Sequence, residues 1–251
     1  DHRDLHSFPT RRSSDLIAAM KTFNMRGCNV TMPDKVEAAK YMDELSPAAR
    51  IIGAINTIVN DNGKLTGYIT DGEGFVHNLK DHGIDIKGKK ITVAGGGGAA
   101  TAIQVQCALD GAREITIFNK NDAFFERTLQ TAEKIKKAVP ECVVNVYDID
   151  DTAKMTEEIQ SSDIFANATI VGMKPLDDQS VVKDLSAFRP GLVVADAVYN
   201  PEETKLLREA KEAGCTCVGG KGMLLWQGVA AFKLYTGQDM PVEDVKKLFF
   251  S

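Results

Sequence analysis

The chain has 251 residues, which is enough for one large domain or for two modest ones that each bury a core. Its composition, with 43% hydrophobic and 26% charged residues and a formal net charge of −5, is that of a globular protein and argues against binding to nucleic acid or to an anionic membrane. No apolar run approaches the ~20 residues that are needed to span a bilayer.

Cysteine and histidine are poorly placed for metal chemistry. The five cysteines are odd in number, and the one-residue spacing of Cys215 and Cys217 does not suit a metal site or a redox pair. The four histidines offer little for a metal centre or for a serine–histidine arrangement. We therefore expect reduced thiols, no metal and a cytoplasmic location.

Residues 1–16 show no hydrophobic period and no turn residues that lead into a strand. The segment resembles translated sequencing-adapter read-through at the end of an assembled reading frame. A targeting peptide is the alternative, because Arg11 and Arg12 form a pair like that of a twin-arginine signal, but no apolar stretch follows them. We therefore expect residues 1–16 to lie outside the fold.

From residue 17 the sequence predicts a first α/β unit that reaches residue 86. Its hairpin is the clearest element, because the segments 54–59 and 65–69 flank the turn sequence Asp61-Asn62-Gly63. A helix is predicted from Thr70-Asp71 to about His82, where Gly83 ends it. The other expected elements are a strand at 27–31, a helix from Pro33 to about Leu45, and a brief helix that restarts at Ser46-Pro47.

The segment 91–100 is the centre of the second unit. Residues 91–94 predict a buried strand, and residues 101–110 have helical spacing. Between them, Gly95, Gly97 and Ala100 fit the dinucleotide fingerprint of a glycine for the tight turn, a glycine for close approach of the pyrophosphate, and a small residue for helix–strand packing. The N-terminus of the following helix offers its N–H groups to a phosphate. The alternative is a glycine-rich turn without a ligand.

Strands and helices alternate after this turn. The expected strands are 114–118, 143–147, 164–168, 192–196 and 215–218, and the expected helices are 124–138, 152–161 and 204–213. Two more helices, 223–235 and 242–249, follow the last strand and are long enough to return to the first unit. The pattern predicts the α/β class, with a doubly wound parallel sheet of the Rossmann type and a smaller N-terminal α/β domain.

Several motifs around this fingerprint resemble those of shikimate dehydrogenases. They are NVTMPDK at 29–35, GAINT at 53–57, TDG at 70–72 and GMLLWQG at 222–228. NKNDAFFE at 119–126 and VYNP at 198–201 are similar to the branch of the family that accepts quinate as well as shikimate. Members of the family begin with a strand and a Ser-x-Ser pair for the substrate carboxylate. Ser13-Ser14 lacks the intervening residue, so we expect a chain that is truncated at its N-terminus.

The resemblance implies an NAD(P)-dependent oxidoreductase that interconverts shikimate and 3-dehydroshikimate, and quinate and 3-dehydroquinate, in the shikimate pathway of aromatic amino-acid biosynthesis. The partner is then a hydroxy-cyclohexene or hydroxy-cyclohexane carboxylate. The oligomeric state stays open, with a homodimer as one alternative. The expected organisation is the foreign-looking segment 1–16, an incomplete substrate-binding domain at 17–86, a dinucleotide-binding domain at 87–222, and C-terminal helices at 223–251 that return to the substrate domain.

The resemblance places the catalytic pair at Lys35 and Asp71, and residues that hold the ring hydroxyls at Thr31, Asn56 and Gln227. Oxidation of a secondary alcohol needs a base for the hydroxyl proton while hydride leaves for the nicotinamide. We therefore expect Lys35 to act as the base and Asp71 to hydrogen-bond and orient the substrate. The alternatives are ordinary surface charge for the charged pair and local backbone hydrogen bonding for the other three.

The cofactor residues follow from the fingerprint and the motifs. They are Gly95, Gly96, Gly97, Gly98, Ala99, Asn119, Lys120, Asn121, Asp122, Thr169, Val198, Tyr199, Asn200 and Gly220. An acidic residue after the second strand favours NAD, whereas a basic residue favours the 2′-phosphate of NADP. Lys120 stands where strict NADP users of the family carry arginine, and Asp122 would repel a phosphate, so both cofactors are compatible with the sequence and NAD is favoured.

Two other function classes are compatible with parts of the sequence. A dinucleotide-sensing module without turnover would keep the glycine turn and lose the pair Lys35 and Asp71. Another two-domain nicotinamide enzyme, such as a folate-linked dehydrogenase, would carry different motifs on the substrate side. An assay of shikimate and quinate with each cofactor separates the three.

Overall fold

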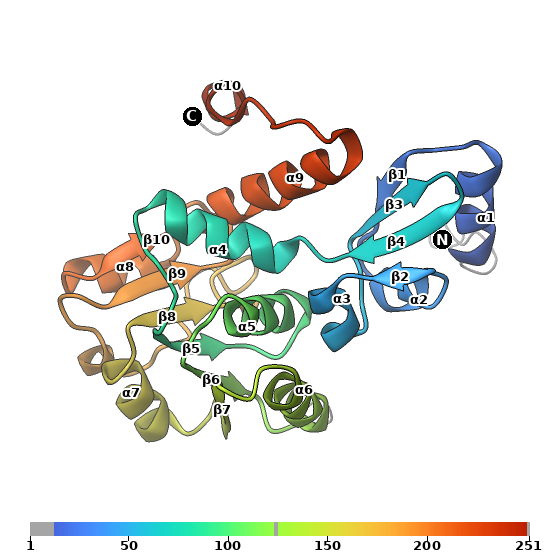
Figure 1. Cartoon of the computed structure of the whole chain (residues 1–251). Coiled ribbons are helices and arrows are strands. Elements are labelled where there is room, and N and C mark those ends of the chain that lie inside the picture. Colours follow the sequence, from blue (N-terminus) through green and yellow to red (C-terminus); the bar gives the residue numbers. More distant parts are fainter. Residues whose placement is uncertain (1–12, 123–124, 250–251) are drawn as a thin grey trace, which may run out of the picture. The chain divides into compact units, whose positions relative to one another are not determined.

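The computed structural model describes residues 13–122 and 125–249 (Figure 1). The chain divides into two compact units, Asp1–Ile69 and Thr70–Ser251, and each unit is built around a sheet of its own. No helix of the described ranges is long and apolar enough to cross a membrane.

The first unit contains a four-stranded mixed sheet in the order β1-β3-β4-β2. β3 pairs antiparallel with both β1 and β4, while β2 pairs parallel with β4. The elements are α1 (Ser13–Thr22), β1 (Gly27–Asn29), α2 (Lys35–Ala39), β2 (Glu44–Leu45), α3 (Pro47–Ile52), β3 (Thr57–Asp61) and β4 (Lys64–Tyr68).

The predicted hairpin is confirmed in the first unit. Asn62 and Gly63 both have positive φ, 54° and 95°, as a two-residue hairpin turn of the primed type requires. The predicted brief helix is also confirmed, since α3 starts at Pro47 and the hydroxyl of Ser46 accepts a hydrogen bond from the N–H of Ala49 at 3.3 Å.

The predicted helix from Pro33 to Leu45 is wrong over most of its length. α2 covers only Lys35–Ala39, and residues 44–45 form β2 instead. The reason is Asp43, whose N–H donates to the carbonyl of Leu65 at 2.9 Å and whose carboxylate accepts from the N–H of Leu65 at 2.7 Å. These two bonds to β4 draw the chain into the sheet and end the helix.

The expectation that residues 1–16 lie outside the fold is wrong for the last of them. Residues 13–16 form the first turn of α1, which buries Ile17 and Met20. A helix with only two buried apolar side chains gives a weak periodic signal, which explains why the sequence pattern failed here. Residues 1–12 lie outside the described part of the chain.

The second unit contains six parallel strands in the order β10-β9-β8-β5-β6-β7 (Figure 1). The strands are β5 (Lys90–Ala94), β6 (Glu114–Asn119), β7 (Val143–Asp148), β8 (Ile164–Asn167), β9 (Val193–Asp196) and β10 (Thr216–Val218). Counted from β5, this is the order 3-2-1-4-5-6 of the doubly wound dinucleotide-binding fold, and the predicted sheet is confirmed. The strand order reverses between β5 and β8.

The helices of the second unit match the predicted alternation, with ends that differ by a few residues. They are α4 (Asp71–Asp81), α5 (Gly98–Leu109), α6 (Phe125–Ala138), α7 (Thr152–Gln160), α8 (Lys205–Glu212), α9 (Gly220–Thr236) and α10 (Val242–Phe249), with the single 3₁₀ turn η1 (Leu185–Ala187). α7 and α8 cover one face of the sheet, where a buried cluster includes Phe118, Ile159, Phe165 and Leu206. Right-handed crossovers place α5 and α6 on the opposite face.

Glycines allow α4 to pack tightly within the second unit. A Cβ on Gly72 would lie 2.4 Å from the carbonyl oxygen of Ala102 in α5, and one on Gly74 would lie 2.6 Å from that of Met223 in α9. α4 therefore groups with α5 and α9, and the compact units divide at Ile69 rather than near the expected residue 86. The assignment of α4 and the C-terminal helices to a substrate-binding domain stays a prediction.

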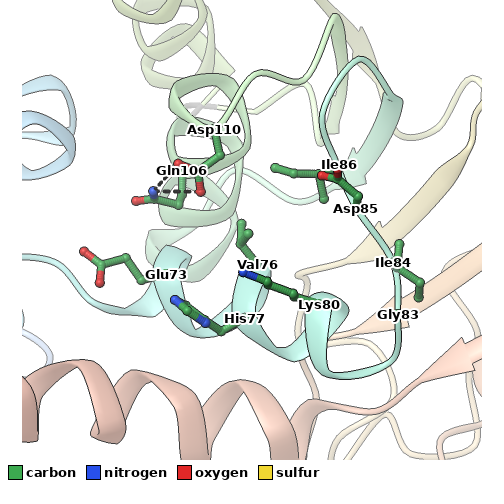
Figure 2. Close-up of a pocket in the computed structure, with 10 residues that line it drawn as sticks. All are labelled: Glu73, Val76, His77, Lys80, Gly83, Ile84, Asp85, Ile86, Gln106 and Asp110. Atoms are coloured by element: carbon green, nitrogen blue, oxygen red, sulfur yellow. Dashed lines mark hydrogen bonds between the residues drawn. The ribbon is translucent and has the colours of Figure 1, made fainter. Parts of the chain in front are cut away.

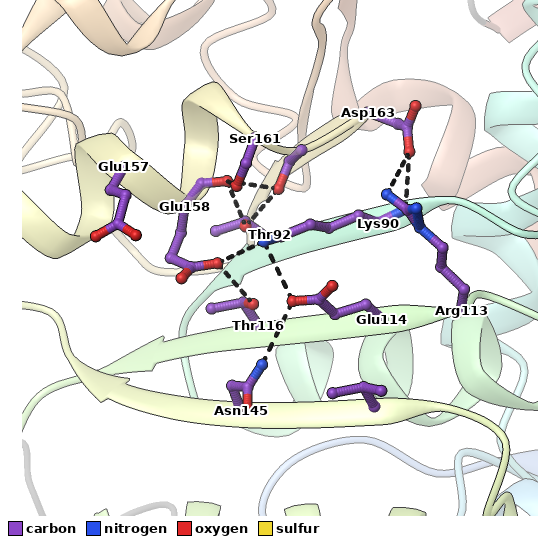
Figure 3. A network of polar contacts seen from close by, with 12 residues as sticks. Lys90, Thr92, Arg113, Glu114, Thr116, Asn145, Glu157, Glu158, Ser161 and Asp163 are labelled. Atoms are coloured by element: carbon purple, nitrogen blue, oxygen red, sulfur yellow. Dashed lines mark hydrogen bonds and ion pairs between the residues drawn. The ribbon is translucent and has the colours of Figure 1, made fainter.

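A buried ion-pair network lies at the amino-terminal edge of the parallel sheet (Figure 3). The ammonium of Lys90, at the start of β5, lies 3.1 Å from Glu114 Oε1 and 2.8 Å from Glu158 Oε2. Glu158 Oε1 pairs with Lys154 at 2.9 Å, and Glu158 Oε2 also accepts a hydrogen bond from Thr116 Oγ1 at 3.2 Å. Burial would raise the pKa of Glu158, but hydrogen bonds from the two ammonium groups outweigh it and hold that pKa below its ordinary value.

We expect Lys90→Met to lower the free energy of unfolding by about 3 kcal/mol, because it leaves buried carboxylates without their central cation. Ionised Glu158 contributes to the free energy of unfolding above its ordinary pKa of about 4.3, and this contribution is lost as the pH falls through its lowered pKa. The difference in unfolding free energy between Lys90→Met and wild type should therefore shrink in acid. Urea denaturation at neutral pH and near pH 4 measures both effects. Lys136→Met is the control, because Lys136 pairs with Glu133 on the exposed face of α6. Equal losses in the two variants would contradict a stabilising network.

Candidate dinucleotide and substrate site

The glycine turn between β5 and α5 has the geometry that the fingerprint predicts. Gly95 has φ = +121°, and a Cβ there would lie 2.7 Å from the carbonyl oxygen of Ala168. The side chain of Ala100 is fully buried and approaches the same point at 3.3 Å. Gly95 therefore makes the turn, and Ala100 lets α5 pack against β5.

The other side of the turn is open. Gly97, Gly98 and Ala99 are exposed, and a Cβ on Gly97 or Gly98 would meet no atom within 4 Å. Gly97 caps α5 with extended backbone and without a side-chain hydrogen bond, so the first N–H groups of the helix face this open side. This arrangement suits the binding of a diphosphate, which the helix dipole also favours.

The end of β6 lies beside the turn. The amide of Asn119 donates to Thr128 Oγ1 at 2.9 Å, and a Cβ on Gly96 would lie within 2.7 Å of both side chains. Gly96 is therefore required for the contact between the turn and β6. Lys120, Asn121 and Asp122 follow as exposed residues, which is where a ribose-binding segment belongs.

The loops after β8 and β9 carry the remaining residues that the sequence predicts for the cofactor. Thr169 is half-buried, and it donates to the side chain of Asn167 from both its N–H and its hydroxyl. Val198 is buried, whereas Tyr199 and Asn200 are exposed. Gly220 begins α9 under the second loop, because a Cβ there would lie 2.5 Å from the carbonyl oxygen of Val198. The structure therefore brings all predicted cofactor residues to the carboxyl ends of the strands within one unit.

Buried polar residues behind these loops were not predicted from the sequence. Gln104 of α5 is fully buried and donates to the carbonyl oxygen of Gly95 at 2.9 Å. Asn167 and Asp196 end β8 and β9, and their side chains hydrogen-bond at 2.9 Å. A polar residue at the end of each apolar strand segment is the signal that could have found the last two.

Three predicted substrate residues lie together in the first unit. The N–H of Ile55 donates to the carbonyl of Lys35 at 2.9 Å, so the segment that starts α2 runs beside the segment that contains Asn56. Asn56 is 4% exposed, and its side-chain oxygen accepts from Thr57 Oγ1 at 3.0 Å. Thr31 is exposed and accepts through its carbonyl from the N–H of Asp34. Lys35 begins α2 and is half-buried.

The other two predicted substrate residues belong to the second unit. Asp71 is the first residue of α4, and Gln227 lies on α9. A Cβ on Gly74 would lie 2.7 Å from the backbone N of Gln227, so α4 and α9 are neighbours at this level. The joint action of these two residues with Lys35 stays a prediction.

A separate groove of about 600 Å³ lies between α4 and α5 (Figure 2). Glu73, His77 and Lys80 line it from α4, and Gln106 and Asp110 line it from the end of α5. Burial and the charge of Asp110 raise the pKa of Glu73. The end of α5 lies at the opposite edge of the sheet from the glycine turn, so this groove is not part of the dinucleotide site.

The thiols and the acidic groups of the described residues form no further centre. All five cysteines are free, and the buried Cys107 and Cys142 have thiol pKa values that burial raises, so these two are poor nucleophiles. Within residues 13–122 and 125–249, no three side chains of the metal-binding types come together as ligands.

Two family models match the chain. The model for the "Shikimate dehydrogenase substrate binding domain" matches residues 4–58, and that for the "Shikimate 5'-dehydrogenase C-terminal domain" matches residues 220–248. Both segments contain residues that the motifs single out, namely Thr31, Lys35, Asn56 and Gln227.

Two curated relatives match over nearly the whole chain. A shikimate dehydrogenase (NADP(+)) of Listeria monocytogenes is 48% identical over 236 residues, which cover 94% of this chain and 81% of the relative. A quinate/shikimate dehydrogenase of Escherichia coli is 49% identical over 245 residues, which cover 98% of this chain and 83% of the relative.

Two solved structures of shikimate and quinate dehydrogenases are also similar to this chain. The shikimate 5-dehydrogenase of Listeria monocytogenes in complex with shikimate and NAD has a TM-score of 0.92 at 48% identity and covers 94% of this chain and 81% of its own. The quinate dehydrogenase of Corynebacterium glutamicum in complex with NAD has a TM-score of 0.85 at 28% identity, with 98% and 84% covered.

Proposed function

Because the chain belongs to the shikimate dehydrogenase family, we propose that it oxidises a ring hydroxyl of shikimate, and of quinate, by hydride transfer to a nicotinamide dinucleotide. The observation that carries the proposal is the open glycine turn at the N-terminus of α5, in a chain that keeps the substrate motifs of the family. The turn supplies the phosphate site, and the motifs supply the residues for the hydroxy acid.

Lys35 takes the proton of the substrate hydroxyl in this proposal. The C–H bond of the same carbon breaks with its electron pair, and the product is the ketone. A bound oxidised dinucleotide supplies the hydride acceptor. Asp71 accepts a hydrogen bond from the substrate and orients the reacting carbon, while Thr31, Asn56 and Gln227 hold the other ring hydroxyls. A positioned acid or base of this kind contributes ~10²- to 10⁴-fold to the rate.

The cofactor is a nicotinamide dinucleotide, and we infer that both NAD and NADP are accepted, with NAD favoured. Support comes from the exposed segment after β6, where Lys120 offers a cation for a 2′-phosphate and Asp122 a carboxylate for a free 2′-hydroxyl. The relatives differ in the same respect, since the curated relative of Listeria monocytogenes is named for NADP(+) and the solved structure from that species holds NAD.

We expect Asp122→Ala to shift the ratio of kcat/KM for NADP over NAD upward by about tenfold or more. Two charges ~4 Å apart at an effective dielectric of ~20 interact by about 4 kcal/mol before screening by salt, so removal of a carboxylate near a phosphate has a measurable effect. Glu133→Ala is the control, because Glu133 is an exposed carboxylate on α6 that pairs with Lys136. An unchanged ratio in Asp122→Ala would show that this carboxylate does not face the 2′ position.

The experiment that tests the function is a matrix of initial rates. Shikimate and quinate are each combined with NAD and with NADP, and the reduced nicotinamide is followed by absorbance. The proposal predicts turnover of at least one hydroxy acid with at least one cofactor. Dinucleotide binding without turnover of either acid would favour a sensing module, and turnover of a folate substrate alone would favour the folate-linked class.

We also infer a cytoplasmic location. Free thiols at all five cysteines support a reducing compartment.

A further inference from the structure

A buried hydrogen-bond network joins the ends of β8 and β9. Asn167 and Asp196 are partners in the register of the two strands and are 1% and 2% exposed. Asn167 Nδ2 donates to Asp196 Oδ1 at 2.9 Å and to the carbonyl of Val171 at 3.0 Å. Its Oδ1 accepts from the N–H and the hydroxyl of Thr169, at 3.1 and 2.7 Å. Both polar atoms of the Asn167 side chain are therefore hydrogen-bonded to the loop that follows β8, and Nδ2 also to Asp196.

Asp196 does the same for the loop after β9. Its Oδ1 also accepts from the N–H of Val198 at 3.0 Å, and its Oδ2 accepts from Thr204 Oγ1 at 2.6 Å. Thr204 is fully buried and caps α8, since its hydroxyl oxygen accepts from the N–H of Leu207. Burial holds the pKa of Asp196 above its ordinary value, although the three hydrogen bonds from Thr204, Val198 and Asn167 act in the opposite direction.

Both loops lie against glycines of the dinucleotide site. The carbonyl oxygen of Ala168, next to Asn167, is 2.7 Å from the Cβ position of Gly95. The carbonyl oxygen of Val198 is 2.5 Å from the Cβ position of Gly220. A shift of either loop by a few tenths of an ångström would therefore move the walls of the site at its turn and at the start of α9.

We propose that the buried pair of Asn167 and Asp196 is a positioning element for the dinucleotide: it locks the loops after β8 and β9 at the spacing that the bound cofactor needs. The inference rests on the proposed function only in that the ligand is a dinucleotide. Neither residue has to touch the ligand, because each acts through the backbone of Thr169 and of Val198.

The direct test is Asn167→Asp, which keeps the shape of the side chain and places a second carboxylate against Asp196. Two carboxylates at hydrogen-bond distance cannot both ionise, so the pair either separates or takes up a proton. At about pH 8 we expect the Kd for NADH and for NADPH to rise about 10- to 100-fold, which corresponds to about 1.4–2.8 kcal/mol. As the pH falls toward about 5, a shared proton restores the hydrogen bond between the two side chains but not the one to the carbonyl of Val171. The Kd should therefore return part of the way to the wild-type value.

Asn145→Asp is the matched control. Asn145 lies on β7 of the same sheet, and its amide donates to Glu114 at 3.4 Å, so this substitution also sets a carboxylate beside a carboxylate, away from the loops. It should lower stability without changing the Kd or its pH dependence. If Asn167→Asp binds both dinucleotides like wild type at every pH, or loses affinity equally at every pH, the proposal is overturned.

A second pair of variants keeps the proposal testable if Asn167→Asp does not fold. Thr204→Val removes the hydroxyl that holds Asp196 Oδ2, and Thr204→Ser retains it. We expect a higher Kd for the valine variant and a wild-type Kd for the serine variant, with both measured under conditions in which the protein is fully folded. Equal Kd values in the two variants would contradict the proposal. Fluorescence titration needs no turnover, so a wild type that binds NADH but does not oxidise shikimate or quinate would overturn the proposed function alone.

Discussion

Lys35→Ala is expected to reduce turnover of shikimate and of quinate by about 10²- to 10⁴-fold, because it removes the group proposed to take the hydroxyl proton. Dinucleotide binding should persist, since the glycine turn that is proposed to hold the phosphates belongs to the second unit and Lys35 to the first. Steady-state kinetics measures the loss in kcat, and fluorescence titration with NADH measures the cofactor affinity.

The control for this prediction is Lys40→Ala. Lys40 follows the same short helix, and its exposed ammonium pairs with Glu37 at 2.6 Å. Its replacement should leave turnover unchanged, which separates a loss of chemistry from a general loss of positive charge near α2. Equal loss of cofactor affinity and of turnover in Lys35→Ala would contradict the assigned roles.

Gly97→Val is expected to have the opposite effect: it should raise the Kd for the dinucleotide by about 100-fold or more, equivalent to about 2.8 kcal/mol. The backbone at Gly97 is extended, with φ = −78°, and a Cβ there meets no protein atom within 4 Å. The valine side chain would therefore fill only the space into which a diphosphate must come, and the fold should be unaffected.

Gly95→Val provides the contrast for Gly97→Val. At Gly95 the positive φ and the carbonyl of Ala168 exclude any side chain, so this variant should lose stability as well as binding. Thermal unfolding and NADH titration of both variants test the distinction. Unchanged binding in Gly97→Val would mean that the glycine turn does not hold the phosphates.

The parallel sheet was predictable because its signals are local and consistent. Apolar runs such as Ile91–Ala94 recur between helical segments, and the glycines at 95 and 97 stand where the first strand meets the first helix. In the structure, Gly95 is required by its positive φ and by the carbonyl of Ala168, whereas Gly97 faces open space on the side where the phosphates are proposed to bind. The hairpin at Asn62-Gly63 was predictable for the same reason, since its backbone conformation is specified by two adjacent residues.

The errors arose where tertiary contacts override local preference. Residues 40–45 have helix-forming composition, but the bonds between Asp43 and Leu65 recruit them to β4, twenty-two residues away. The compact units divide at Ile69 because glycines at 72 and 74 bring α4 against α5 and α9, a contact that helical periodicity does not reveal. The functional domains at 17–86 and 87–222 stay predictions.

The buried polar network was missed for a related reason. Asn167 and Asp196 are single polar residues at the ends of apolar strands, and the sequence does not reveal that the strands are neighbours. Once the strand order is known, a buried amide beside a buried carboxylate is expected to be hydrogen-bonded to it. The remaining partners of both side chains are then found in the loops that follow the two strands. The proposed substrate residues, by contrast, were predicted from motifs, because no periodicity distinguishes Lys35 or Asp71 from surface charge.

In the proposed reaction, a hydride moves from the carbinol carbon of the hydroxy acid to the nicotinamide ring. The most direct measurement uses shikimate, and in parallel quinate, with deuterium on the carbon that bears the reacting hydroxyl, followed by mass spectrometry of the reduced dinucleotide. Transfer of the label into the nicotinamide, at a rate that falls about 10²- to 10⁴-fold in Lys35→Ala, is the predicted result. Reduced dinucleotide that forms without the label, or no transfer from either acid to NAD or NADP, would contradict it.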